Sequence, residues 1–152
     1  MVVKAKRGFR AYTQTHTFTL RGCERVYELL SSRGEEEINK AFGNMLVKAG
    51  IKVRKNPKNK KRRVMSDMFD GKGGYTGAAI LGSSAADIHT YPEEMYGKTV
   101  EVEVNVCSLN GDAMELHIRT MMELMFRLVT TFRPKETIYR VSDKRYLEPL
   151  EY

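Results

Sequence analysis

In two stretches of the chain, residues expected in the core alternate with polar residues. A period of two residues is typical of half-buried β-strands. In the first, threonines alternate with His16, Phe18 and Leu20. The second covers residues 100–107. Its polar positions, which lie between valines, are Glu101, Glu103, Asn105 and Cys107. We therefore expect each strand to place one face in the core, and the second strand to carry acids and a thiol on its other face.

A period close to 3.6 residues predicts two long helices. The first follows Gly34 and three acidic residues, which are favourable at a helix N-terminus, and ends near Gly50. Its apolar face consists of Ile38, Ala41, Phe42, Met45, Leu46 and Ala49. The second begins after Asp112, a good N-cap residue, and ends before Pro134. Its apolar face consists of Met114, Ile118, Met121, Met122, Met125, Val129 and Phe132. For this methionine-rich face, core packing against a sheet is favoured over an adaptable binding surface.

Four shorter segments, residues 51–54, 63–68, 75–81 and 137–141, are expected to be further strands. The order of elements predicts one α+β domain over residues 1–152, a two-layer α/β sandwich with a mainly antiparallel sheet and helices packed on one face. No apolar run approaches the roughly 20 residues of a membrane-spanning helix, and the start of the chain lacks the apolar segment of a signal peptide. We therefore expect a cytoplasmic protein with no membrane partner and with two free thiols.

The positive charge of the chain is concentrated in one short region. The formal net charge is +7, and eight positive charges lie between residues 52 and 63, so the rest of the chain sums to −1. Such a run repels itself, so residues 55–62 are predicted to be a mobile basic loop. It could be an arm for nucleic acid or anionic lipid, but no aromatic residues interleave with the charges, and this favours a solvated loop. A nucleic-acid partner is not expected.

The reactive side chains of the sequence gather in residues 82–93. They follow a small, apolar segment, residues 75–81, which is the predicted buried strand. Within this stretch lie Ser83 and Ser84, and further along come Asp87, His89 and Glu93. A polar cluster after a buried strand is a common place for a site, because the scaffold fixes the backbone while the side chains face a crevice.

This stretch resembles the signature of the prokaryotic S-adenosylmethionine decarboxylase proenzymes, which are small pyruvoyl-dependent enzymes. The family pattern is Glu-Ser-His, three residues, then His-Thr-Trp-Pro-Glu. Here Ser84 is followed at the same spacing by His89-Thr90-Tyr91-Pro92-Glu93. Upstream, Thr76-Gly77 corresponds to a hydroxyl residue followed by glycine, and downstream Cys107 ends a strand as the family's catalytic cysteine does. The likeness covers most of the chain in order, and the central stretch is its specific part.

The resemblance implies self-cleavage. The Ser84 hydroxyl would attack the carbonyl of Ser83, and the ester formed would eliminate to leave a pyruvoyl group derived from Ser84. This covalent cofactor would divide the chain into fragments of roughly residues 1–83 and 84–152. The ketone would then accept electrons as the substrate loses carbon dioxide. The implied reaction converts S-adenosylmethionine to its decarboxylated form for polyamine synthesis, in a homodimer with sites near its interface.

The resemblance also implies a role for each neighbour. Thr76 would donate a hydrogen bond to the oxyanion formed during cleavage. His89 is suited to moving a proton near neutral pH, and Cys107 would reprotonate the product carbon as a general acid. Glu93 would bind the ribose hydroxyls, and Phe69 would stack on adenine.

Several positions depart from the family pattern and keep other functions open. Ser83 replaces the glutamate before the reactive serine, and Ala85 replaces the histidine after it. Asp87 adds a charge, and Tyr91 replaces tryptophan. These changes could redirect the site toward arginine or ornithine, or the chain could be an uncleaved, non-catalytic homologue that binds a partner subunit or a nucleoside.

A serine hydrolase is a weaker hypothesis for the same stretch. Ser84, Asp87 and His89 lie too close together on an extended chain to converge as a triad, and the nucleophile-elbow pattern is absent. Metal-dependent chemistry is not predicted either.

Overall fold

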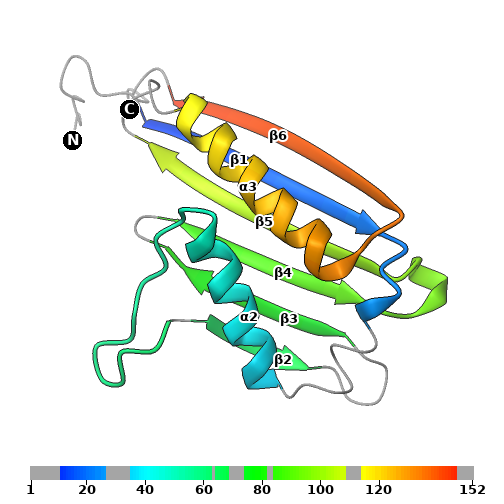
Figure 1. Ribbon diagram of the computed structural model, residues 1–152. Helices are drawn as coiled ribbons and strands as arrows, with labels where there is room; N and C mark the ends of the chain where they lie inside the picture. Colours follow the sequence, from blue (N-terminus) through cyan, green and yellow to red (C-terminus); the bar gives the residue numbers. More distant parts are fainter. Residues whose placement is uncertain are drawn as a thin grey trace, which may run out of the picture.

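The chain folds into one antiparallel sheet covered by helices on one face (Figure 1). The computed structural model describes residues 11–26, 35–62, 64–68, 74–81, 84–108 and 114–146. In chain order, the elements are β1 (Ala11–Arg21), α2 (Glu35–Lys48), β2 (Val64–Met68), β3 (Tyr75–Ile80), β4 (Ala85–Tyr91), the short 3-10 helix η1 (Glu94–Tyr96), β5 (Thr99–Ser108), α3 (Met114–Phe132) and β6 (Glu136–Tyr146). The strand order is β2-β3-β4-β5-β1-β6, which confirms the predicted α+β architecture.

Strands β1 and β5 lie side by side, and their alternation has the predicted effect. Phe18 pairs with Val102 in the antiparallel register, and both side chains are buried beneath the helices. Their polar neighbours in sequence point to the other face of the sheet, because successive side chains of a strand alternate between faces. From Gln14 to Leu20 of β1 and from Val100 to Val106 of β5, the alternation therefore separates a covered face from a more exposed polar face, and the covered face includes the polar side chains of Gln14 and His16.

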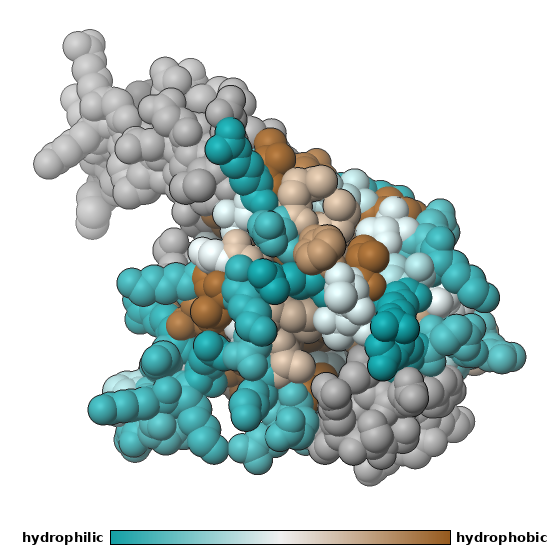
Figure 2. Space-filling model, in the orientation of Figure 1, coloured by the Kyte–Doolittle hydropathy of each residue, from teal (hydrophilic) through white to brown (hydrophobic). Residues whose placement is uncertain are grey.

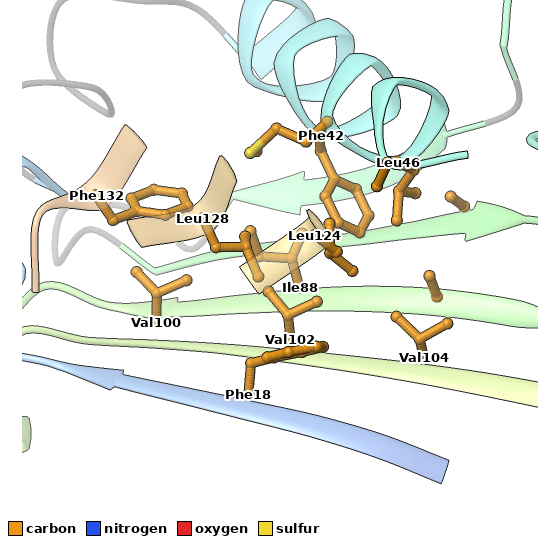
Figure 3. Close-up of a cluster of buried hydrophobic side chains, with 14 of the residues drawn as sticks. Phe18, Phe42, Leu46, Ile88, Val100, Val102, Val104, Leu124, Leu128 and Phe132 are labelled. Atoms are coloured by element: carbon orange, nitrogen blue, oxygen red, sulfur yellow. The ribbon is translucent and has the colours of Figure 1, made fainter. Parts of the chain in front are cut away.

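Helix α2 lies over the β2–β4 half of the sheet, whereas α3 lies over β5 and β1 (Figure 1). Gly50 adopts a left-handed conformation just after α2, and the amide of Ile51 bonds to the carbonyl of Leu46, so the predicted helix end is confirmed. The two helices touch where the Thr131 hydroxyl donates to the Met45 sulfur at 3.6 Å. Figure 3 shows Phe42 and Leu46 of α2 meeting the α3 leucines above the valines of β5. No helix in the described part of the chain is long and apolar enough to cross a membrane.

The predicted apolar face of α3 is partly wrong. Ile118, Met122 and Val129 are exposed, whereas Leu124 and Leu128 are fully buried between α3 and the sheet. The helix carries two adjacent apolar stripes, and periodicity alone does not say which stripe packs inward. The predicted N-cap, Asp112, and the side chain of Met114 lie outside the described residues.

Other expected strands differ in extent. Residues 51–54 form only an isolated bridge, from Val53 to Leu81, and the last strand is longer than predicted at Glu136–Tyr146. Strand β4 was not predicted, because only one of its inward positions is a large apolar residue and its alternation is therefore weak. Its inward positions are Ala86, Ile88 and Thr90, all buried.

A polar network fixes α2 to the strand that carries Thr76. The buried Tyr75 hydroxyl donates to the Asn39 side-chain carbonyl, and the Asn39 amide donates to Ser66 Oγ at 2.7 Å. Burial, and secondarily the charge of Glu35, raises the pKa of Tyr75 well above its ordinary value. At Gly77, a Cβ would lie 2.6 Å from the Tyr75 hydroxyl oxygen. Only glycine therefore fits beside Thr76 without moving this anchor.

Candidate functional site

The candidate site lies on the face of the sheet opposite the described helices. Side chains of this face come from three neighbouring strands, and they are Thr76 of β3, Asp87 and His89 of β4, and Glu101 and Glu103 of β5. All five are only partly buried. A half-buried polar face allows these groups to meet a ligand while the covered face holds the strands in place.

Thr76 and His89 are brought into direct contact. They are cross-strand partners in the β3–β4 register, and Thr76 Oγ1 lies 3.1 Å from His89 Nδ1. Directly opposite residues on an antiparallel pair share a face and have closely spaced Cβ atoms. The predicted hydroxyl and imidazole therefore form one unit.

Asp87 extends this unit on the same strand. Its Oδ1 atom lies 3.4 Å from His89 Nε2. A carboxylate at this position favours a proton on Nε2, which leaves Nδ1 to accept a hydrogen bond from the Thr76 hydroxyl. Such an arrangement favours one tautomer of the imidazole and orients its ring.

Asp87 lies close to two other acidic side chains on the same face of the sheet. Asp87 pairs with Glu103, and His89 pairs with Glu101. Partial burial raises the pKa of the Asp87 carboxyl; His89 opposes this rise, and the charges of Glu103 and Glu101 add to it. The sequence placed the two glutamates on a polar strand face, but only the β4–β5 register shows that they flank Asp87 and His89.

Ser84 lies away from this unit. It directly precedes β4, and its carbonyl accepts a hydrogen bond from the Leu81 amide at 2.9 Å across the β3–β4 connection. His89 is five residues further along the extended chain, which corresponds to about 17 Å at roughly 3.3 Å per residue. Within one chain, His89 and Thr76 are therefore too distant to act on Ser84. Ser83 lies outside the described residues.

Cys107 belongs to the Ser84 end of the sheet. Ala85 pairs with Asn105, and Cys107 is two residues beyond Asn105 on β5. Glu93 instead belongs to the His89 end, where it precedes η1 and is partly buried. Phe69 follows β2 and lies outside the described residues. The predicted residues thus form two groups at opposite ends of the β4–β5 pair.

The second cysteine is unsuited to chemistry. Cys23 is fully buried, and its thiol donates to the Leu20 carbonyl at 3.5 Å. Burial raises the pKa of this thiol to about 11, so it stays protonated at neutral pH. Across the described part of the chain, no group of three or more histidine, cysteine and acidic side chains could hold a metal ion.

Comparisons with known proteins show a similarity of fold. No protein-family model and no curated protein matches the sequence. The structure is similar to the adenosylmethionine decarboxylase from Aquifex aeolicus VF5, with a TM-score of 0.63 and 17% identity over 93% of this chain and 98% of that chain. It is also similar to the AdoMetDC-delta26 monomer of Trypanosoma brucei, with a TM-score of 0.54 and 18% identity. That match covers 84% of this chain but 45% of the other, so this chain spans less than half of that protein. The chain therefore has the fold of an adenosylmethionine decarboxylase.

Proposed function

We propose that the chain is a self-cleaving, pyruvoyl-dependent decarboxylase that acts on S-adenosylmethionine. The observation that carries the proposal is the placement of the sequence signature on this fold. Ser84 lies at the tight connection between β3 and β4, and the Thr76–His89 pair lies on one face at 3.1 Å. Fold similarity alone would not specify the chemistry, because one fold can host many functions.

The bond-breaking steps of cleavage begin with groups that this connection supplies. The Ser84 hydroxyl attacks the carbonyl carbon of residue 83, a C–O bond replaces the C–N bond, and the freed nitrogen takes a proton. Loss of the Ser84 Cα proton then expels the new carboxylate and leaves dehydroalanine, and water replaces the nitrogen, which departs as ammonia. The ketone that remains supplies the electron sink required for decarboxylation.

The described backbone around Ser84 fits this reaction. Residues 75–80 of β3 pair with 85–90 of β4, and β4 also pairs with β5. A break between residues 83 and 84 would leave both fragments hydrogen-bonded within one sheet. The processed protein would therefore keep its fold.

The separation of Ser84 from His89 favours a homodimer. Two sheets pack face to face about 10 Å apart, with their strands close to aligned. If two copies faced each other through their polar faces with β4 strands reversed, the Ser84 end of one would lie against the His89 end of the other. Each site would then combine Ser84 and Cys107 of one copy with Thr76, His89 and Glu93 of the other.

Intact-mass measurement of the purified protein tests self-cleavage. The expected result is two fragments of roughly residues 1–83 and 84–152, and Ser84→Ala should give a single species near 17.4 kDa. A single species from the unsubstituted chain would instead favour the uncleaved, non-catalytic homologue. Full decarboxylase activity of the Ser84→Ala protein would refute the mechanism.

Co-expression of two inactive variants tests the shared site. Ser84→Ala removes the nucleophile, and His89→Ala removes the imidazole. In a two-fold dimer, the mixed species has one site built from the two intact residues, so random pairing should restore about a quarter of the wild-type activity. Activity that stays at the level of the separate variants would place each site within one chain.

A second substrate class is favoured by a specific observation. Asp87, Glu101 and Glu103 surround His89 with carboxylates, which can accept hydrogen bonds from the guanidinium of arginine or the side-chain ammonium of ornithine, whereas a sulfonium has no N–H to donate. Release of labelled carbon dioxide should be compared among S-adenosylmethionine, ornithine and arginine. Faster release from a basic amino acid would reassign the substrate while leaving the cleavage chemistry intact.

A further inference from the structure

The basic segment of the chain is folded into a defined hairpin. Lys55 and Arg62 form a bridge, and the Asn56 amide donates to the Lys61 carbonyl at 2.7 Å. The side chain of Asn56 accepts the Lys58 amide, and that of Asn59 accepts the Lys61 amide, each at 3.0 Å. These bonds give the like-charged run a specific backbone path.

The hairpin is also fixed to the body of the protein. Lys61 forms a salt bridge of 3.2 Å with Glu36, and Arg62 donates to the side chain of Asn44. The Arg62 side chain crosses α2 at Gly43, where a Cβ would come within 3.2 Å of Arg62 Cδ. At the base, the Arg54 amide donates to the Ile80 carbonyl at 2.8 Å. The hairpin is therefore tied to α2 on one side and to β3 on the other.

A groove of about 840 Å³ lies between the hairpin and α2. Its lining contains five basic residues, Lys40, Lys55, Lys60, Lys61 and Arg62, and two acids, Glu36 and Glu37. Figure 2 shows hydrophilic side chains over the surface region where Figure 1 places the hairpin. A groove of this size falls in the range of small-molecule sites, which is about 300–1,000 Å³.

The charge of the lining is not balanced by the protein. Over the ranges that the structure describes, Lys61 forms the one salt bridge of the hairpin, with Glu36. Positive charges held close together repel each other, and an anion between them would relieve this repulsion. The lining has an excess of three positive charges, which suits a ligand with more than one negative charge.

We propose that this groove binds a small molecule that carries two or more adjacent phosphate groups. Lysine ammonium groups bind phosphate as point charges, and arginine adds directional donors. The lining contains no aromatic side chain on which the bases of single-stranded nucleic acid could stack. The basic residues of the lining all come from the hairpin and the facing helix, and a groove of this extent fits a short polyphosphate better than a long nucleic-acid backbone.

Calorimetric titration at low ionic strength tests this proposal with inorganic tripolyphosphate and orthophosphate as probes. Tripolyphosphate should bind, and orthophosphate should bind much more weakly because it offers a single phosphate group. The Lys40→Gln/Lys55→Gln variant, which removes one charge from each wall, should weaken tripolyphosphate binding by at least about tenfold.

A matched control separates a site from general attraction. Lys48→Gln/Lys58→Gln removes one charge from the same helix and one from the same hairpin, both outside the groove lining. It should change the affinity less than twofold. Equal losses in the two double variants, equal affinity for the two probes, or no binding would overturn the proposal. Binding of duplex RNA without binding of tripolyphosphate would overturn it in favour of a nucleic-acid surface.

Discussion

The two faces of the sheet consist of alternate residues of the same strands, but they are held in different ways. On the covered face, Tyr75 and Ile88 are almost completely buried by close packing. On the polar face, their sequence neighbours Thr76 and His89 are partly exposed and meet through a hydrogen bond. Packing of large side chains contributes more to folding stability than one partly buried hydrogen bond. Substitutions on the covered face should therefore change stability, and substitutions on the polar face should change chemistry.

The largest loss of stability is expected at the junction of α2 and the sheet. Phe42→Ala removes a fully buried ring and should lower the free energy of unfolding by about 3–5 kcal/mol. Thr17→Ala, a control on the polar face, should change it by less than about 0.5 kcal/mol. Urea denaturation measures both values. Comparable losses from the two substitutions would mean that the polar face is also part of a packed core.

A smaller loss is expected from Gly77→Ala. Its Cβ would lie 2.6 Å from the Tyr75 hydroxyl oxygen, and overpacking of this kind costs about 1–3 kcal/mol. The loss should be smaller in a Tyr75→Phe background, because that change removes the nearest atom. A double-mutant cycle by urea denaturation measures this coupling, and strictly additive losses would show that the Tyr75 hydroxyl is not the obstacle.

On the polar face, His89→Gln should slow self-cleavage or turnover by about 10²–10⁴-fold, the usual contribution of a general acid or base. Because His89 is only partly buried, stability should change by less than about 0.5 kcal/mol. Time-resolved intact mass and carbon dioxide release separate the two steps. Loss of folding with loss of activity would assign His89 a structural role.

The same comparison explains which helices and strands could be predicted from the sequence. Strands β1 and β5 and helix α2 were predictable because each has one apolar face. Helix α3 has two apolar faces. Leu124 and Leu128 are buried while Ile118 and Met122 are exposed, and this depends on how the helix packs against the sheet. Tertiary packing makes that choice, so local periodicity does not contain it.

The site was predictable in composition but not in layout. The motif identified Thr76, Ser84 and His89, and the contact of Thr76 with His89 depends on the β3–β4 register. The distance of Ser84 from His89 depends on the residues between them forming a strand, and β4 was missed because its buried positions include the small Ala86 and the polar Thr90. A motif fixes residue types and spacing, whereas their distance depends on the secondary structure between them.

The smallest change in stability is expected from Asp87→Asn. It should be a gain, whereas substitutions on the covered face should lower stability. Partial burial raises the pKa of Asp87 in the folded protein, so the folded state binds the proton more tightly than the unfolded state. Stability should then fall as pH rises from the ordinary aspartate pKa through the raised value, because the unfolded state releases its proton first. Above that range the charged carboxylate destabilises the fold.

Asparagine carries no such charge. The Asp87→Asn protein should therefore be slightly more stable than wild type at neutral pH, and this advantage should shrink at acid pH, where Asp87 is protonated. Thermal unfolding at a series of pH values measures the difference, with Glu37→Gln, which changes an exposed acid on α2, as the control. A variant that is less stable at neutral pH would mean that the contact of Asp87 with His89 outweighs the repulsion from Glu101 and Glu103. In that case the acids of the polar face would be part of the scaffold as well as of the site.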